Sequence, residues 1–268
     1  MARFSKRLER AFETHGQICL GIDPSESELS NWDLPDSAAG AREYGLHLVD
    51  AAASRVGIVK PQVGFFERFG SLGYQALEEV ITAARDASLL VIADAKRGDI
   101  GTTMLGYAQA WFGDDSPLRS DALTVSGYLG PSSLSDTLEY ARDIQGGLFL
   151  LAATSNPEAG ELQKAVIDGK TVSARAIELA REFGHGEVGV VIGATQKLED
   201  FGIDFVKSED IGIPILAPGF GAQGARLEDM QKLFGASHHR VIASLSREMT
   251  KGGPQKVISN LDKAKAQL

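Results

Sequence analysis

The segment Leu89-Leu90-Val91-Ile92-Ala93 is an uninterrupted apolar run, and the charged segment Asp94-Ala95-Lys96-Arg97-Gly98-Asp99-Ile100 follows it directly. Apolar residues that are continuous rather than alternating indicate a strand covered on both faces, as in a parallel sheet. Seven further short β-branched and aliphatic runs occur along the chain, and nearly all of them are continuous rather than alternating. The predicted strands are Gln17–Ile22, Arg55–Val59, Ser88–Ala93, Asp121–Val125, Gly147–Ala152, Glu187–Ile192, Ile213–Leu216 and Arg240–Ala243.

Between most of these runs, apolar residues recur at spacings of three and four, which predicts helices. The predicted helices are Phe4–Thr14, Asp36–Ser54, Phe69–Ala87, Gly101–Trp111, Pro131–Asp143, Thr171–Phe183, Ala225–Phe234 and Pro254–Ala266. Eight short parallel strands that alternate with helices favour an α/β fold, the (β/α)8 or TIM barrel, because closure removes both sheet edges. The extra helix precedes the first strand. A doubly wound open sheet is the alternative.

No low-complexity linker divides the chain. The polar segments Pro24–Pro35 and Asn156–Gly169 each follow a strand and are predicted to be long loops. We therefore expect a single barrel domain over residues 1–268, a length that such barrels commonly use.

Composition excludes several classes of protein. The 268 residues are 43% hydrophobic and 24% charged, which is typical of a globular chain. The formal net charge of -9 disfavours nucleic acid and anionic membranes as partners. A single cysteine, Cys19, cannot form an internal disulfide. The charged N-terminal segment lacks the apolar stretch of a signal peptide, and no apolar run approaches the roughly 20 residues of a membrane span, so we expect a cytoplasmic protein.

Catalytic groups of such barrels project from the carboxyl ends of the strands. In an extended segment Asp94 and Lys96 point to the same side and reach one pocket. Nearby carboxylates keep a lysine protonated, which suits proton donation. Gly98 permits a turn, after which Asp99 folds back or projects toward another subunit. The structural alternative is an ion-pair network at the barrel rim.

A glycine-rich loop, Pro218-Gly219-Phe220-Gly221-Ala222-Gln223-Gly224, follows the seventh predicted strand. Its glycine spacing also fits the weak dinucleotide-binding fingerprint, but too few residues follow Gly224 to build the rest of a doubly wound domain. Phosphate sites of barrels lie in the loops after strands seven and eight. We expect this loop and Arg247, after the eighth strand, to bind phosphate.

The five histidines show no metal-ligand spacing, and no Ser-His-Asp order or nucleophile elbow is present. We therefore expect a reaction without metal or organic cofactor.

The segment Asp94–Thr103, with its pattern Asp94-x-Lys96-x-x-Asp99, resembles the signature of the orotidine 5′-phosphate decarboxylase family. Further residues of that family occur in its order and at its strand ends between residues 20 and 247: Asp23, Lys60, Ser126, the loop Pro218–Gly224 and Arg247. Thr154–Pro157 and the pair Ser246-Arg247, in place of the commoner Gly-Arg, resemble the longer bacterial subgroup that includes mycobacterial enzymes.

The resemblance implies that orotidine 5′-monophosphate loses its C6 carboxylate to give UMP, the last step of de novo UMP synthesis, without a cofactor. Lys96 would stabilise the carbanion and protonate it, and Asp94 and Asp99 would hold Lys96. The implied substrate contacts are Asp23 and Lys60 to the ribose hydroxyls, Ser126 to the pyrimidine amide, and Gly219, Gly221, Gln223 and Arg247 to the phosphate. Asp99 and Thr103 would reach the neighbouring site of a homodimer.

Two alternatives remain open at this point. One is a magnesium-dependent sugar-phosphate decarboxylase or synthase of the same barrel superfamily. Those enzymes have a glutamate metal ligand at the end of the second strand, where this chain has Lys60. The other is a barrel that binds a phosphoribosyl ligand without turnover.

Overall fold

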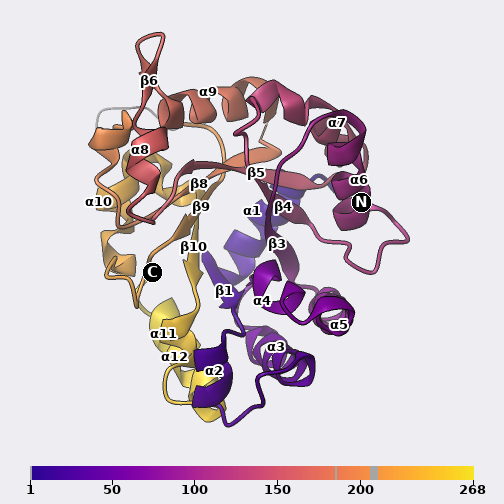
Figure 1. Ribbon diagram of the computed structural model, residues 1–268. Coiled ribbons are helices and arrows are strands. Elements are labelled where there is room, and N and C mark those ends of the chain that lie inside the picture. The colour runs from indigo at the N-terminus through magenta and orange to yellow at the C-terminus, as the bar shows by residue number, and fades with distance from the viewer. Residues whose placement is uncertain (1, 185, 206–210) are drawn as a thin grey trace.

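The strands of the main sheet close into a barrel (Figure 1). The structure is a computed structural model that describes residues 2–184, 186–205 and 211–268. Neighbouring strands run parallel in the order β1-β10-β9-β8-β5-β4-β3-β2. The barrel strands are β1 Ile18–Ile22, β2 Ile58–Pro61, β3 Leu90–Arg97, β4 Ala122–Val125, β5 Gly147–Ala153, β8 Val188–Ile192, β9 Ile215–Pro218 and β10 Val241–Leu245. The predicted barrel is confirmed, and the open doubly wound sheet was wrong.

Helices surround the barrel (Figure 1). They are α1 Phe4–His15, α2 Glu26–Asn31, α3 Ala38–Ala52, α4 Val63–Glu67, α5 Gly70–Asp86, α6 Gly101–Phe112, α7 Ser135–Asp143, α8 Ala159–Gln163, α9 Val172–Gly184, α10 Met230–Phe234, α11 Arg247–Thr250 and α12 Val257–Lys265. The predicted helices beginning at Pro131, Ala225 and Pro254 contain a short 3-10 segment before their α-helical part. Among the described residues, no helix is both long and apolar enough to cross a membrane.

Both segments predicted as long loops contain regular structure, so that prediction was wrong. Within Pro24–Pro35, the Ser25 hydroxyl accepts a hydrogen bond from the Glu28 amide at 3.2 Å and caps α2. Asn156–Gly169 contains α8 and the strand β6 Val166–Ile167, which pairs antiparallel with β7 Lys170–Thr171. The turn residues Asp168 and Gly169 both have positive φ, as an Asp-Gly hairpin turn requires.

The N-terminal helix α1 closes the amino end of the barrel. Phe4, Leu8 and Ala11 are buried against residues that fill the barrel interior. The Phe4 ring meets Phe149 of β5 edge to face, with ring centroids 6.0 Å apart. A side chain at Gly147 would collide with Phe4, since a Cβ there would lie 2.3 Å from that ring. The carboxyl end of the barrel is therefore left for a functional site.

We predict that Leu8→Ala lowers the free energy of unfolding by about 2–5 kcal/mol, because it opens a cavity in this packed plug. Leu8 is 4% exposed, whereas Leu72 on α5 is 65% exposed, so Leu72→Ala is a matched control that should change stability by less than about 0.5 kcal/mol. Urea unfolding of both variants measures the difference. Equal losses would show that α1 is not part of the core.

Candidate active site

The carboxyl end of β3 departs from regular strand geometry where its charged residues begin. Its pairing with β4 runs from Ala93 opposite Leu123 to Arg97 opposite Val125, so β3 has three residues where β4 has one. Lys96 has φ +49°, which is uncommon for a residue with a side chain. This bulge brings Asp94 and Lys96 together at the barrel mouth, as bulges near active sites commonly do.

The Asp94 carboxylate is shared by two ammonium groups. Its Oδ2 lies 2.8 Å from Lys60 Nζ, and its Oδ1 lies 2.7 Å from Lys96 Nζ. The Thr124 hydroxyl donates to Oδ1 at 3.0 Å. With its amide nitrogen facing the carboxylate, Gln62 donates to Oδ2 at 2.5 Å and accepts from Lys96 Nζ at 3.1 Å. Both carboxylate oxygens are thus fully engaged.

The charges of this cluster stabilise one another. Burial by itself would raise the pKa of Asp94, but the ammonium groups of Lys60 and Lys96 outweigh burial and hold that pKa well below its usual range. Burial by itself would lower the pKa of Lys60, yet the carboxylates of Asp94 and Asp23 raise it above its usual value. Asp94 and Lys60 are therefore both ionised at neutral pH. The Lys60 side chain is 7% exposed and that of Lys96 is 45% exposed, so Lys96 presents its charge to the open space.

A cavity of about 410 Å³ lies over this cluster. Seven of the predicted site residues line it: Asp23, Lys60, Asp94, Lys96, Gly219, Gln223 and Arg247. The charged residues of the lining comprise three cations and two carboxylates, so the cavity is locally positive although the chain carries a formal charge of -9. Asp23 Oδ1 is buried and has no hydrogen-bond partner among the described residues. Asp23 itself lines the cavity, but this oxygen is shielded from the open space.

At the other end of the cavity, the glycine loop approaches Arg247. Gly219 is buried with φ +113°, and the loop closes on itself through hydrogen bonds from the Ala225 amide to the Gly219 carbonyl and from the Gly224 amide to the Gly221 carbonyl. The Arg247 guanidinium makes no ion pair or hydrogen bond with the described residues. Together, a glycine-rich backbone and an unpaired guanidinium are suited to an anion such as phosphate.

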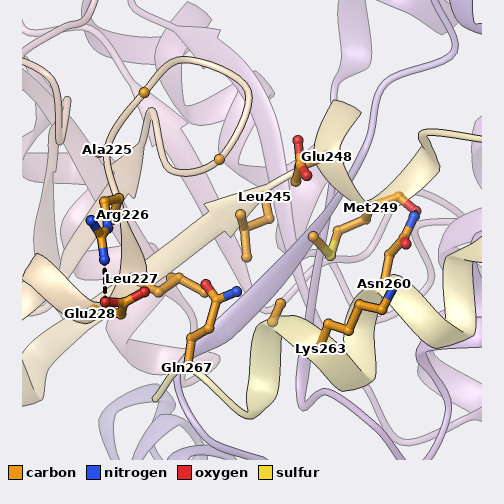
Figure 2. Close-up of a pocket in the computed structure, with 13 residues that line it drawn as sticks. Ala225, Arg226, Leu227, Glu228, Leu245, Glu248, Met249, Asn260, Lys263 and Gln267 are labelled. Carbon is orange, nitrogen blue, oxygen red and sulfur yellow. Dashed lines mark hydrogen bonds and ion pairs between the residues drawn. The ribbon is translucent and has the colours of Figure 1, made fainter.

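Gly221 faces away from this cavity, contrary to its predicted place. A Cβ on Gly221 would lie 2.9 Å from Cβ of Glu248 on α11, and Gly221 lines a second cavity of about 370 Å³ behind the loop. Figure 2 shows that this second cavity is bounded by Leu245, by α11 and by the Asn260 and Lys263 side chains of α12. Gly221 thus lets the loop pack closely on α11.

Asp99, Thr103 and Ser126 also do not line this first cavity. Asp99 Oδ1 accepts a hydrogen bond from the Ile100 amide at 2.8 Å, where α6 is about to begin. Thr103 is exposed on the first turn of α6. Ser126 lines an adjoining groove of about 560 Å³, which shares Leu151 and Gln163 with the cavity. In the structure, Asp94 is the carboxylate that pairs with Lys96.

Several polar lining residues were not predicted: Gln62, Thr124, Thr154, Ser155, Asn156, Gln163, Ser244 and Ser246. Gln62 lies two residues after Lys60, a spacing that puts both side chains on the same side of an extended chain. Thr154, Ser155 and Asn156 follow β5 directly, so their position at a strand end is the signal in the sequence that marks them as candidates. Among the described residues, no group of three or more His, Cys, Asp or Glu side chains could hold a metal ion.

Comparisons with known proteins agree on one family. The model of the orotidine 5′-phosphate decarboxylase / HUMPS family matches residues 16–254. The curated orotidine 5′-phosphate decarboxylase of Streptomyces coelicolor is 47% identical over 262 residues, which cover 95% of this chain and 92% of that protein. The enzyme of the same name from Corynebacterium glutamicum strain R is 44% identical, with coverage of 94% and 91%.

Solved structures share the fold. A structure from Streptomyces avermitilis superposes with a TM-score of 0.92 at 43% identity, over 100% of this chain and 95% of that one. The UMP synthase of Leishmania donovani has a TM-score of 0.80 at 27% identity, and the match covers 100% of this chain but 56% of that one. With the family model matched over most of its length and curated relatives above 40% identity, the chain belongs to the orotidine 5′-phosphate decarboxylase / HUMPS family.

Proposed function

We propose that the chain, acting as one barrel domain, catalyses the cofactor-free decarboxylation of orotidine 5′-monophosphate to UMP and CO2, the last step of de novo UMP synthesis. The curated relatives are named orotidine 5′-phosphate decarboxylase. The observation that carries the proposal is the Asp94 carboxylate held between Lys60 and Lys96 in a cavity that also contains a glycine loop and Arg247.

Lys96 is the proposed proton donor. When the bond between C6 and its carboxylate breaks, CO2 leaves and the electron pair stays on C6, which then takes a proton from Lys96 Nζ. An ammonium fixed next to C6 stabilises this charge as it develops and needs no reorganisation at that moment. Asp94 holds Lys96 Nζ at 2.7 Å while the lysine side chain stays open to the cavity.

The remaining contacts follow the shape and charge of the cavity. Asp23, which lines the cavity, would accept a hydrogen bond from a ribose hydroxyl, with Lys60 beside it. Gly219, Gln223 and Arg247 would bind the phosphate, and Gly221 would shape the loop from behind. Ser126, in the adjoining groove, is the proposed contact for the pyrimidine amide.

Lys60 argues against the magnesium-dependent alternative. It stands at the end of β2, where those enzymes would need a carboxylate ligand, and it is ion-paired with Asp94. An ammonium repels a cation and cannot coordinate it. The ion pair therefore favours a reaction in which cations of the protein itself stabilise the charge.

We also propose that a second copy of the chain completes each site with Asp99 and Thr103. Both residues lie outside the cavity of their own chain, next to the start of α6. Three large apolar side chains nearby, on the loops after β3 and β4, are exposed: Ile100 at 60%, Tyr128 at 77% and Leu129 at 55%. Exposed apolar side chains gathered beside a functional site are typical of an interface.

Lys96→Ala is expected to lower kcat for orotidine 5′-monophosphate by about a thousandfold or more, because it removes both the proton donor and the charge that opposes the carbanion. Binding of UMP, measured by calorimetry, should change only a few-fold. Lys232→Ala on α10 is the control and should behave as the parent. Turnover within tenfold of the parent would exclude Lys96 from the central role, and UMP binding without turnover in the parent would favour the non-catalytic barrel.

Decarboxylase activity is expected to be unchanged after incubation with EDTA and gel filtration. The reason is that ammonium groups, rather than a metal, stabilise the negative charge that develops on C6. The absorbance assay with orotidine 5′-monophosphate measures this directly. A loss of activity that added magnesium restores would contradict the proposal and favour the sugar-phosphate alternative.

Mixing Lys96→Ala subunits with Asp99→Ala subunits is expected to restore up to about a quarter of the parental activity per subunit. Random pairing makes half of the dimers mixed, and each mixed dimer then has one intact site out of two. If Asp99 acted in its own subunit, every site would carry a lesion and nothing would return. Mass spectrometry verifies that mixed dimers form. If they form and no activity is recovered, the shared site is disproved, whereas the proposed decarboxylase activity is unaffected.

A further inference from the structure

The bulge in β3 leaves the backbone amide of Lys96 without a regular strand partner. Between the pairs Ala93 with Leu123 and Arg97 with Val125, Thr124 is the one residue of β4 that faces three residues of β3. The Lys96 amide donates instead to the Thr124 hydroxyl oxygen, at 2.9 Å. A side-chain hydroxyl thus replaces the backbone acceptor that a regular ladder would supply.

The same hydroxyl also binds the carboxylate that holds the Lys96 side chain. Thr124 Oγ1 donates to Asp94 Oδ1 at 3.0 Å, and that oxygen is the one paired with Lys96 Nζ at 2.7 Å. A hydroxyl has one hydrogen to donate, and here Asp94 receives it while a lone pair accepts the Lys96 amide hydrogen. Thr124 is 1% exposed, so neither bond competes with bulk water.

We infer that Thr124 is a positioning residue for the proposed decarboxylation, fixing both the backbone and, through Asp94, the ammonium of Lys96. A residue with positive φ keeps its conformation only where its surroundings hold it. The outer side of the bulge is held as well, because Arg97 donates to Glu67 Oε1 at 2.5 Å and to the Tyr74 hydroxyl at 3.2 Å. Thr124 is the anchor on the inner side, facing the cavity. This inference rests on the proposed function.

Substitutions at position 124 test this role, because threonine and valine, and likewise serine and alanine, differ chiefly in one hydroxyl. Thr124→Val keeps the shape of threonine and removes the hydroxyl, whereas Thr124→Ser and Thr124→Ala differ from each other in the hydroxyl alone. We expect kcat to fall roughly 10- to 100-fold in the valine and alanine variants, the effect of losing a hydrogen bond to a charged group. The serine variant should stay within about threefold of the parent, and UMP affinity should change by less than about threefold in all of them.

Thr137 on α7 supplies a matched control. It is fully buried, and its hydroxyl has no partner among the described residues, so Thr137→Val removes a hydroxyl from the interior without touching the site. Its kcat should equal that of the parent. An unchanged kcat in Thr124→Val, or a serine variant as slow as the alanine variant, would overturn the inference, as would UMP affinity that falls in parallel with kcat.

Amide hydrogen exchange separates this inference from the proposed function. Exchange of the Lys96 amide should become at least about tenfold faster in Thr124→Val than in the parent and should stay slow in Thr124→Ser and Thr137→Val. If the parent does not turn over orotidine 5′-monophosphate, the proposed function fails, and the exchange rate still decides whether Thr124 holds Lys96. Equal exchange rates in the parent and in Thr124→Val would overturn the positioning role regardless of activity.

Discussion

The site depends on one buried carboxylate that two ammonium groups share. Moving an ionised carboxylate out of water costs on the order of several kcal/mol, which only close partners and hydrogen bonds offset. Asp94 finds these partners on three neighbouring strands or their ends, in Lys60, Lys96 and Thr124. Because β2, β3 and β4 are adjacent and parallel, their carboxyl ends lie within reach of one carboxylate. Closure of the barrel brings Asp23, after β1, and the glycine loop, after β9, to the same cavity.

Local charge, rather than net charge, decides what this cavity attracts. The formal charge of -9 would repel an anionic ligand at long range, but salt screens charges over about 8 Å at physiological ionic strength. A ligand at the barrel mouth therefore experiences mainly Lys60, Lys96 and Arg247. Asp94 neutralises part of this charge, whereas the Arg247 guanidinium has no ion-pair partner among the described residues.

The sequence predicted the barrel because nearly all of the predicted strands read as continuous apolar runs, and it predicted the site because polar residues follow those runs at a shared edge. Asp23, Lys60 and Asp94 meet for that reason. Beyond the last residue of a strand, the direction of the chain depends on backbone dihedral angles, which the hydrophobic periodicity of the sequence does not reveal. Gly221 turns behind its loop, and Thr124 acquires its role from a bulge on another strand. Elements as short as β6 and α8 span too few residues to show a period.

The helix at the amino end of the barrel has a consequence for the order of events during synthesis. Its partners lie far along the chain, since Phe4 packs on Phe149 and the Ser5 hydroxyl donates to Glu187 at 2.7 Å. During synthesis, α1 must therefore wait for β5 and for the residues next to β8 before it can dock. Until then its apolar face is exposed to chaperones and to other nascent chains.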